Sequence, residues 1–170
     1  FPTLGLELIL NAGWKSNLSA TDKNFMTYNG TLNIFRKIDK KGKLVFANSS
    51  NAMIINNNNF EFYQAASIGG NNGLRAYRNQ RFSGKSYFVN NAEIRWDLGR
   101  IKNNIVPTNI GVLVGYDLGR VWNDREISNR WHQDVGAAVW LNILETFSAR
   151  LGYFIGEDGG RISGGVGMNF

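Results

Sequence analysis

Cysteine is absent from the sequence, and histidine occurs only once, at His132. Without cysteine the chain can form no disulfide bond, no thiolate metal site and no cysteine nucleophile. A single histidine gives little basis for a histidine metal site or for Ser-His-Asp catalysis. Its neighbours Trp131 and Asp134 instead favour a turn at the start of a strand. We therefore expect no metal ion, no cofactor and no catalytic residue, and we do not expect an enzyme.

Long apolar runs and prolines are also scarce. No run approaches the ~18 residues of a membrane-spanning helix, although hydrophobic residues make up 43% of the chain. If the chain lies in a membrane, it must therefore cross it as strands. Twenty glycines and only two prolines favour strands that are joined by tight turns.

The chain carries a net charge of +6, which is compatible with a nucleic-acid partner. Its lysines and arginines are scattered, however, and their densest run, residues 37–43, has the composition of a solvated hairpin tip. We therefore expect no nucleic-acid partner.

Nine segments alternate between apolar and polar residues with a period of two, which predicts β-strands and no helix of consequence. Several are as long as the ~9–11 residues that cross a bilayer at a tilt. The third alternates least cleanly of the nine. The predicted strands are residues 4–14, 25–38, 43–55, 60–68, 88–98, 110–119, 134–143, 147–155 and 161–170.

The less apolar face of these segments carries charged residues at mid-strand, among them Glu93, Asp117 and Arg150, mixed with glycines. In a soluble β-sandwich this face would meet solvent, and glycine would be disfavoured there. In a membrane barrel it lines the lumen, where small residues make room for an inserted segment, and the apolar face meets lipid. We therefore predict an all-β protein, an antiparallel transmembrane β-barrel with about nine strands, over a soluble β-protein.

A long loop separates the fourth and fifth predicted strands. Its stretches Leu-Arg-Ala-Tyr and Arg-Phe-Ser-Gly resemble the sixth-loop signature of the bacterial surface antigen superfamily, the BamA and TamA type of outer-membrane assembly barrel. The family usually has glycine at the third position, so alanine would cost about 1 kcal/mol or more if that position needs a positive φ. The motif residues are Leu74, Arg75, Ala76, Tyr77, Arg81, Phe82 and Gly84.

The segments 91–95 and 115–122 resemble the two strands that follow this loop in the family. The resemblance implies that loop 69–86 folds back into the lumen and that Glu93 and Asp117 hold Arg75 there. Alternation places both carboxylates on the polar faces of adjacent strands, within reach of one guanidinium. Removing one partner would leave an unpaired charge in a crowded lumen, at a cost on the order of 3 kcal/mol.

The last segment fits the C-terminal recognition pattern of outer-membrane barrels, with Ser163, Gly165, Met168 and Phe170 at its positions. Its three glycines, at 164, 165 and 167, either form a labile seam or leave lumenal space. The resemblance covers roughly residues 60–170. It implies that residues 1–170 are one barrel domain, the C-terminal part of a 16-stranded barrel in the outer membrane of a Gram-negative bacterium.

The function that the resemblance implies is the insertion or translocation of proteins at the outer membrane. Its partners would be outer-membrane lipid, unfolded outer-membrane client proteins and accessory assembly subunits. As an alternative, the barrel anchors or serves a larger protein that carries an N-terminal phosphoesterase-like or patatin-like enzymatic domain. A third reading is a small stand-alone barrel with a structural or adhesive role.

Overall fold

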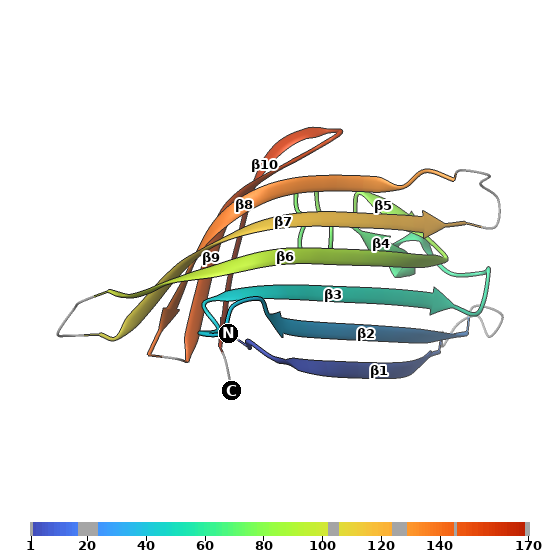
Figure 1. Cartoon of the computed structure of the whole chain (residues 1–170). Coiled ribbons are helices and arrows are strands. Elements are labelled where there is room, and N and C mark those ends of the chain that lie inside the picture. The colour runs from blue at the N-terminus through green and yellow to red at the C-terminus, as the bar shows by residue number, and fades with distance from the viewer. Residues whose placement is uncertain (1, 17–23, 102–105, 124–128, 145, 169–170) are drawn as a thin grey trace.

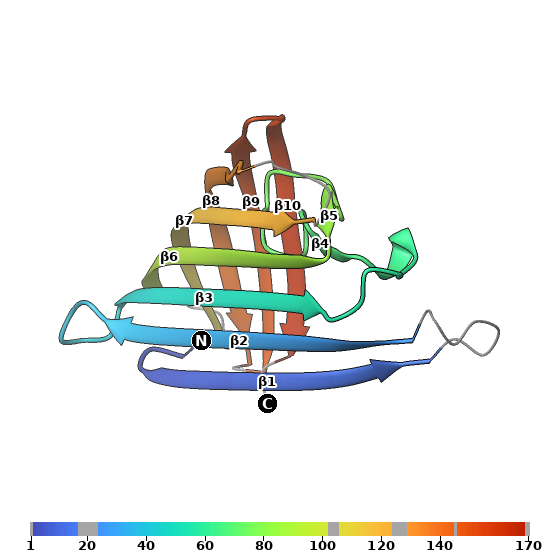
Figure 2. The same cartoon turned by 90° about the vertical axis from the view of Figure 1, so that its right-hand side faces the viewer.

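The computed structural model describes residues 2–16, 24–101, 106–123, 129–144 and 146–168. Eight strands form one antiparallel sheet in the order β1-β2-β3-β6-β7-β8-β9-β10, which confirms the predicted all-β class. The sheet curls so strongly that β9 and β10 run across the direction of β1 to β3 (Figures 1 and 2). Its strands are β1 (Gly5–Lys15), β2 (Phe25–Lys37), β3 (Leu44–Ile55), β6 (Ser86–Ile101), β7 (Thr108–Trp122), β8 (His132–Ile143), β9 (Phe147–Gly156) and β10 (Gly159–Met168).

Within the described ranges, no helix has the length and hydropathy that crossing a bilayer would require. The single helical turn there is a 3-10 helix, η2 (Phe62–Gln64).

The predicted strand over residues 60–68 is wrong. This segment contains η2 and then only a short strand, β4 (Ala66–Ile68), which pairs with β5 (Phe82–Gly84) in a separate two-stranded sheet. The side chain of Glu61 caps η2 together with that of Gln64, which ends the extended conformation. Ala66 and Ile68 are buried inside the protein, so their spacing reflects packing on the main sheet and not contact with lipid.

The correction removes the odd strand number. Three strands of the main sheet precede the loop that carries β4 and β5, and five follow it. Among the described residues the number of long strands is therefore eight, and an even number is usual for bacterial barrels. Figures 1 and 2 show β4 and β5 inside the curve of the sheet, where they pack against β6 and β7.

The two faces of the sheet have the opposite polarity to that of a water-soluble protein. Apolar side chains such as Val114, Val135 and Leu151 are 52 to 65% exposed on the convex face. On the concave face Asp117 is fully buried and Glu93 is 5% exposed. Apolar atoms outside and ionised groups inside are the arrangement of a membrane barrel wall, whose outer face contacts lipid and whose inner face lines the lumen.

Candidate functional site

The inward loop starts with a tight turn built on glycines. The N–H of Gly69 donates to the carbonyl of Asn72 at 3.0 Å, and that of Gly70 donates to the carbonyl of Leu74 at 2.7 Å. Gly69, Gly70 and Gly73 all have positive φ angles, of 126°, 59° and 99°. Glycine accepts such angles without steric cost. This turn delivers the motif residues 74–77 to the inner face of the sheet, where all four are buried.

Ala76 does not have the conformation that would penalise alanine. The non-glycine residues with positive φ in the described ranges are Gln80 and Leu144. Ala76 is not among them, and its backbone N–H donates to Asp134 Oδ2 at 3.1 Å. The conditional cost of alanine for a positive φ therefore does not arise at this position.

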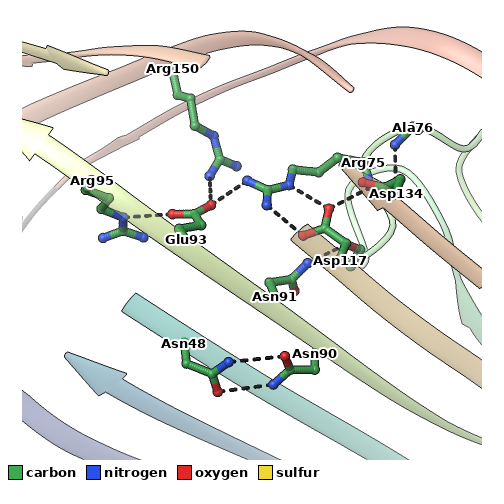
Figure 3. A network of polar contacts seen from close by, with 11 residues as sticks. Asn48, Arg75, Ala76, Asn90, Asn91, Glu93, Arg95, Asp117, Asp134 and Arg150 are labelled. Carbon is green, nitrogen blue, oxygen red and sulfur yellow. Dashed lines mark hydrogen bonds and ion pairs between the residues drawn. The ribbon is translucent and has the colours of Figure 1, made fainter. Parts of the chain in front are cut away.

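Arg75 is the centre of a buried network of charges (Figure 3). Its Nε and Nη2 atoms donate to the two carboxylate oxygens of Asp117 on β7, at 2.7 and 2.6 Å. Its Nη1 atom donates to Oε1 of Glu93 on β6. The structure therefore brings together the three charged residues that the sequence analysis selected, and it joins two of them by a bidentate pair, the strongest form of such a contact.

Glu93 is shared by three arginines. Besides Arg75, it accepts hydrogen bonds from Arg95 Nε on Oε2, at 2.7 Å, and from Arg150 Nη1 on Oε1, at 3.3 Å. Arg150 lies on β9, so the network ties the loop to strands on both sides of β7. A buried carboxylate with several cationic donors is the arrangement that compensates its loss of water.

The guanidinium of Arg75 also has apolar partners above and below it. Its Cζ atom lies 4.0 Å from the centroid of the Phe154 ring on β9, in cation-π geometry. On β7, a Cβ atom added at Gly115 would lie 2.4 Å from Nη2 of Arg75. A Cβ at Gly136 would meet the Phe154 ring at 2.5 Å. Inner-face glycines thus make room for the loop arginine and for the ring that stacks on it.

Tyr77 anchors the next turn of the loop to the other end of the sheet. Its hydroxyl donates to the carbonyl of Gln133 at 3.1 Å and accepts from the N–H of Glu157 at 3.2 Å. Its own carbonyl accepts from Arg161 Nη1 on β10 at 3.1 Å. Counting the contacts of Arg75 and Ala76, the loop is therefore hydrogen-bonded to β6, β7, β8 and β10, and it contacts β9 through the Phe154 ring.

The second half of the motif is less deeply held. Arg81 forms a salt bridge with Asp158 at 2.8 Å, but both side chains are more than 40% exposed. Phe82 stacks on the ring of His132, with centroids 3.6 Å apart. Gly84 lies so close to β7 that an added Cβ would be 2.5 Å from the Trp122 carbonyl oxygen. His132 is the first residue of β8, as expected of a residue at a strand start.

The predicted C-terminal signal is described in part. Ser163 and Gly165 lie on β10, opposite Gly152 and Arg150 of β9, and line the lumenal cavity. Met168 ends β10. Phe170 lies outside the described residues.

A polar cavity of about 500 Å³ lies beside the charged network on the inner face. It is lined by neutral polar residues of β2, β3 and β6 and by the arginines around Glu93. The residues that line it include Asn33, Ser49, Asn91, Arg95, Arg150 and Ser163. The described residues contain no cluster of histidine, aspartate and glutamate that could hold a metal ion.

Sequence reasoning missed several partners of the loop. These partners are Asp134 on β8, Phe154 on β9 and Arg161 on β10. Their contacts depend on the register of strands that are distant in sequence from residue 75. The available signal was a glycine directly opposite a bulky residue on the next strand. Gly136 pairs with Phe154 in this way.

A family model described as haemolysin secretion/activation protein ShlB/FhaC/HecB matches residues 4–143, which is more than half of the chain. No curated protein matches the sequence. The match supports a family of outer-membrane translocation barrels, the broader of the two expectations from the sequence. It does not point specifically to the BamA and TamA type.

Proposed function

Because the chain belongs to the haemolysin secretion/activation family, whose members are outer-membrane transporters of Gram-negative bacteria, we propose that its curled sheet guides a secreted polypeptide across the outer membrane beside an anchored lumenal loop. The outer membrane is therefore its location, and protein translocation its general activity. Beyond this general activity, we propose that the lumenal loop is anchored, that the substrate passes along the inner face of the sheet, and that the substrate is a secreted polypeptide.

The observation that carries the proposal is the buried pair between Arg75 and Asp117. Both side chains are at least 94% buried, and Glu93 is buried beside them. A buried pair has to offset the loss of hydration of both ions, and breaking it by removing one partner costs about 3–5 kcal/mol. An arrangement of this kind holds the loop in one position while a flexible substrate moves past it.

The remaining inner face supports a route for a polypeptide. Many inward residues of β2 and β3 are neutral amides and hydroxyls: Asn33 and Ser49 line the cavity, and farther along the same strands follow Asn29, Thr31 and Asn51. Asn51 donates to Thr31 Oγ1 at 2.5 Å and accepts from the Tyr87 hydroxyl at 2.6 Å. Amide and hydroxyl side chains can exchange hydrogen bonds with any backbone. An extended chain of any sequence would therefore meet matching groups and no buried charge on this wall.

A charge-reversal series tests the anchoring role. We expect R75E to reduce secretion of the cognate polypeptide strongly, because it places three carboxylates together in a low-dielectric lumen. Adding D117R should restore part of the lost secretion, since the pair is then re-formed with exchanged signs. R81E is the matched control, because Arg81 lies in the same loop but its salt bridge is half-exposed and such pairs contribute little.

Secretion would be compared at equal amounts of folded barrel, measured by the shift between heated and unheated samples on gels. Normal secretion by R75E, with no additional effect of D117R, would contradict the anchoring role. A loss that R81E produces to the same extent would do so as well.

The insertion of other membrane proteins is a second candidate, favoured by one observation. β10 is an edge of the sheet in the described residues, and it contains five glycines, at 159, 160, 164, 165 and 167. Glycine weakens a strand and its ladder, so this edge is suited to exchange partners with an incoming strand. Depletion of the protein separates the two functions: a transporter loses one secreted product, whereas an insertion factor lowers the amounts of many barrels.

A further inference from the structure

Asp134 on β8 is a buried carboxyl group whose hydrogen bonds are incomplete. It is 2% exposed. Its Oδ2 atom accepts the backbone N–H of Ala76 at 3.1 Å. Its Oδ1 atom is shielded from solvent and receives no hydrogen bond from any residue that the structure describes. Because a buried polar atom without a partner is costly, an ionised Asp134 would be poorly stabilised in this position.

The side chain of Asp134 lies against a second carboxyl group, that of Asp117 on β7. The two residues pair in register, and their carboxyl groups are in hydrogen-bonding contact (Figure 3). Both oxygens of Asp117 already accept hydrogen bonds from Arg75. Arg75 in turn donates to Glu93 as well. If Asp117 and Asp134 were both ionised, two touching negative charges would therefore compete for one guanidinium that a third carboxylate also uses.

The other arginines near the loop bind elsewhere. Arg95 and Arg150 contact Glu93, on the far side of Arg75. Arg161 donates to the backbone carbonyl of Tyr77. On β9 the residue opposite Asp134 is Gly156, which has no side chain. These contacts give the pair of aspartates no second cation with which to offset the repulsion between them.

We propose that Asp117 and Asp134 share one proton, which Asp134 carries and donates to Asp117. Asp117 then remains ionised toward Arg75, and the contact between the two carboxyl groups becomes a hydrogen bond. When two carboxyl groups occupy one site, the repulsion between their charges favours protonation of one of them. A hydrogen bond from O–H to a carboxylate is also about twice as strong as one between neutral groups.

The shared proton makes Asp134 a positioning residue for the lumenal loop. One of its oxygens holds the backbone N–H of Ala76, and its proton holds the carboxylate that binds Arg75. Two successive loop residues are thereby attached to β7 and β8 through one neutral group. This role rests on the anchored loop of the proposed function, whereas the shared proton follows from the contact between the carboxyl groups alone.

Infrared spectroscopy tests the proton directly, because a protonated carboxyl group has a carbonyl stretch that an ionised carboxylate lacks. The full-length protein is purified in a detergent without ester or carboxyl groups and measured at neutral pH, where exposed carboxyl groups are ionised. We expect a carboxylic acid band that shifts in deuterium oxide and is absent from D134N. D158N is the matched control and should retain the band, because Asp158 is 44% exposed. A wild-type spectrum without the band, or a band that persists in D134N, would overturn the proposal.

The positioning role is tested by comparing D134N with D134A. An asparagine amide can accept the Ala76 N–H and donate to Asp117, so D134N should leave the loop as resistant to chymotrypsin as in the wild type. D134A removes both hydrogen bonds, and cleavage after Tyr77, which is buried, should become about ten-fold faster. Equally fast cleavage of D134N and D134A would contradict the positioning role. Slower cleavage of D134N than of the wild type would mean that an ionised Asp134 repels Asp117, and would overturn the shared proton.

Two features keep these results separate from other effects. Gel mobility of unheated samples checks the folding of each variant, and the infrared comparison of the wild type with D134N decides even if D134A does not fold. The R75E series tests the anchoring of the loop by secretion. Absence of the infrared band would therefore remove the shared proton and leave the anchoring role standing, whereas normal secretion by R75E would do the reverse.

Discussion

The sheet carries a polar cluster on each of its faces, and Figure 3 shows a member of each on β6, Glu93 of the inner cluster and Asn90 of the outer one. The inner cluster is ionised and centred on Arg75, Glu93 and Asp117. The outer amide cluster, Asn48, Ser50 and Asn90, is neutral. Both clusters satisfy most of their hydrogen bonds internally. They differ in charge, and the difference follows from the medium that each face contacts.

An ionised carboxylate is tolerated on the inner face because hydrogen-bond donors of the protein replace the water molecules that it loses on burial. Glu93 has three arginine partners, and Asp117 accepts two bonds from Arg75 with further support from the backbone N–H of that residue at 3.3 Å. In the described part of the chain, the outer face near Asn48 and Asn90 has no comparable set of ionised partners, and a charged side chain that contacts lipid destabilises a barrel. Neutral amides are tolerated on the outer face because two of them can form reciprocal hydrogen bonds. The comparison predicts different responses to the same kind of mutation.

The largest effect is expected from removing one ion of the inner cluster. D117A leaves the Arg75 guanidinium buried with Glu93 as its remaining carboxylate, and we expect a loss of about 3–5 kcal/mol in the free energy of unfolding. Denaturant titration of the barrel in vesicles measures it. Asp158→Ala is the matched control, since its salt bridge with Arg81 is half-exposed and should contribute less than about 1 kcal/mol. Equal losses in both variants would remove the distinction between buried and exposed pairs in this loop.

Two adjacent serines provide the most direct comparison of the faces. Ser50 belongs to the outer amide cluster, whereas Ser49 points inward and lines the polar cavity. S50K should destabilise the barrel by about 2–4 kcal/mol, the cost of lysine on the lipid face near the bilayer midplane. S49K places the same charge in the lumen, where it remains hydrated, and should change stability little. Similar losses for both, measured by denaturant titration, would contradict the assignment of faces.

These faces are the part of the fold that the sequence predicts well. Period-two alternation identified the strands of the main sheet, and the position of Glu93 and Asp117 followed from it. The segment 60–68 was misassigned because burial against an inserted loop produces the same apolar spacing as a strand in lipid. The outer amide cluster was visible only as imperfect alternation of segment 43–55, since the pairing of Ser50 with Asn90 depends on register across a 30-residue connection.

The contacts above and below Arg75 were also beyond the sequence. Phe154 reaches the guanidinium only because β7, β8 and β9 align Gly115, Gly136 and Phe154 in one row. The period of two assigns each residue to a face of the sheet, but it does not give the height of that residue along the barrel axis. That height depends on the register of each hairpin, which turn geometry and packing determine together.

A smaller effect is expected from filling the space around the arginine. In G115A the new methyl group would lie 2.4 Å from Nη2 of Arg75, so the guanidinium must shift, at a cost of about 1–3 kcal/mol. Gly165 is the matched control, because an added Cβ there meets no atom within 4 Å. Thermal unfolding compares the two variants. A loss in G165A as large as that in G115A would indicate a general effect of glycine in the strands and not a specific fit around Arg75.

The smallest effect is expected from making the outer amide cluster apolar. N48L, N90L and S50A together remove the reciprocal amide pair and the serine hydroxyl that bonds to both amides, and replacing all the partners by apolar groups leaves no unsatisfied side chain behind. The free energy of unfolding should therefore change by less than about 1 kcal/mol. The same treatment of the inner pair, R75L with D117L, also removes both charges, but it leaves Glu93 with two arginines and the loop without its anchor. That variant should lose stability and loop protection from protease, whereas the outer variant should lose neither. Greater destabilisation by the outer variant would mean that the amides hold β3 and β6 together, and the ordering of the two faces would be reversed.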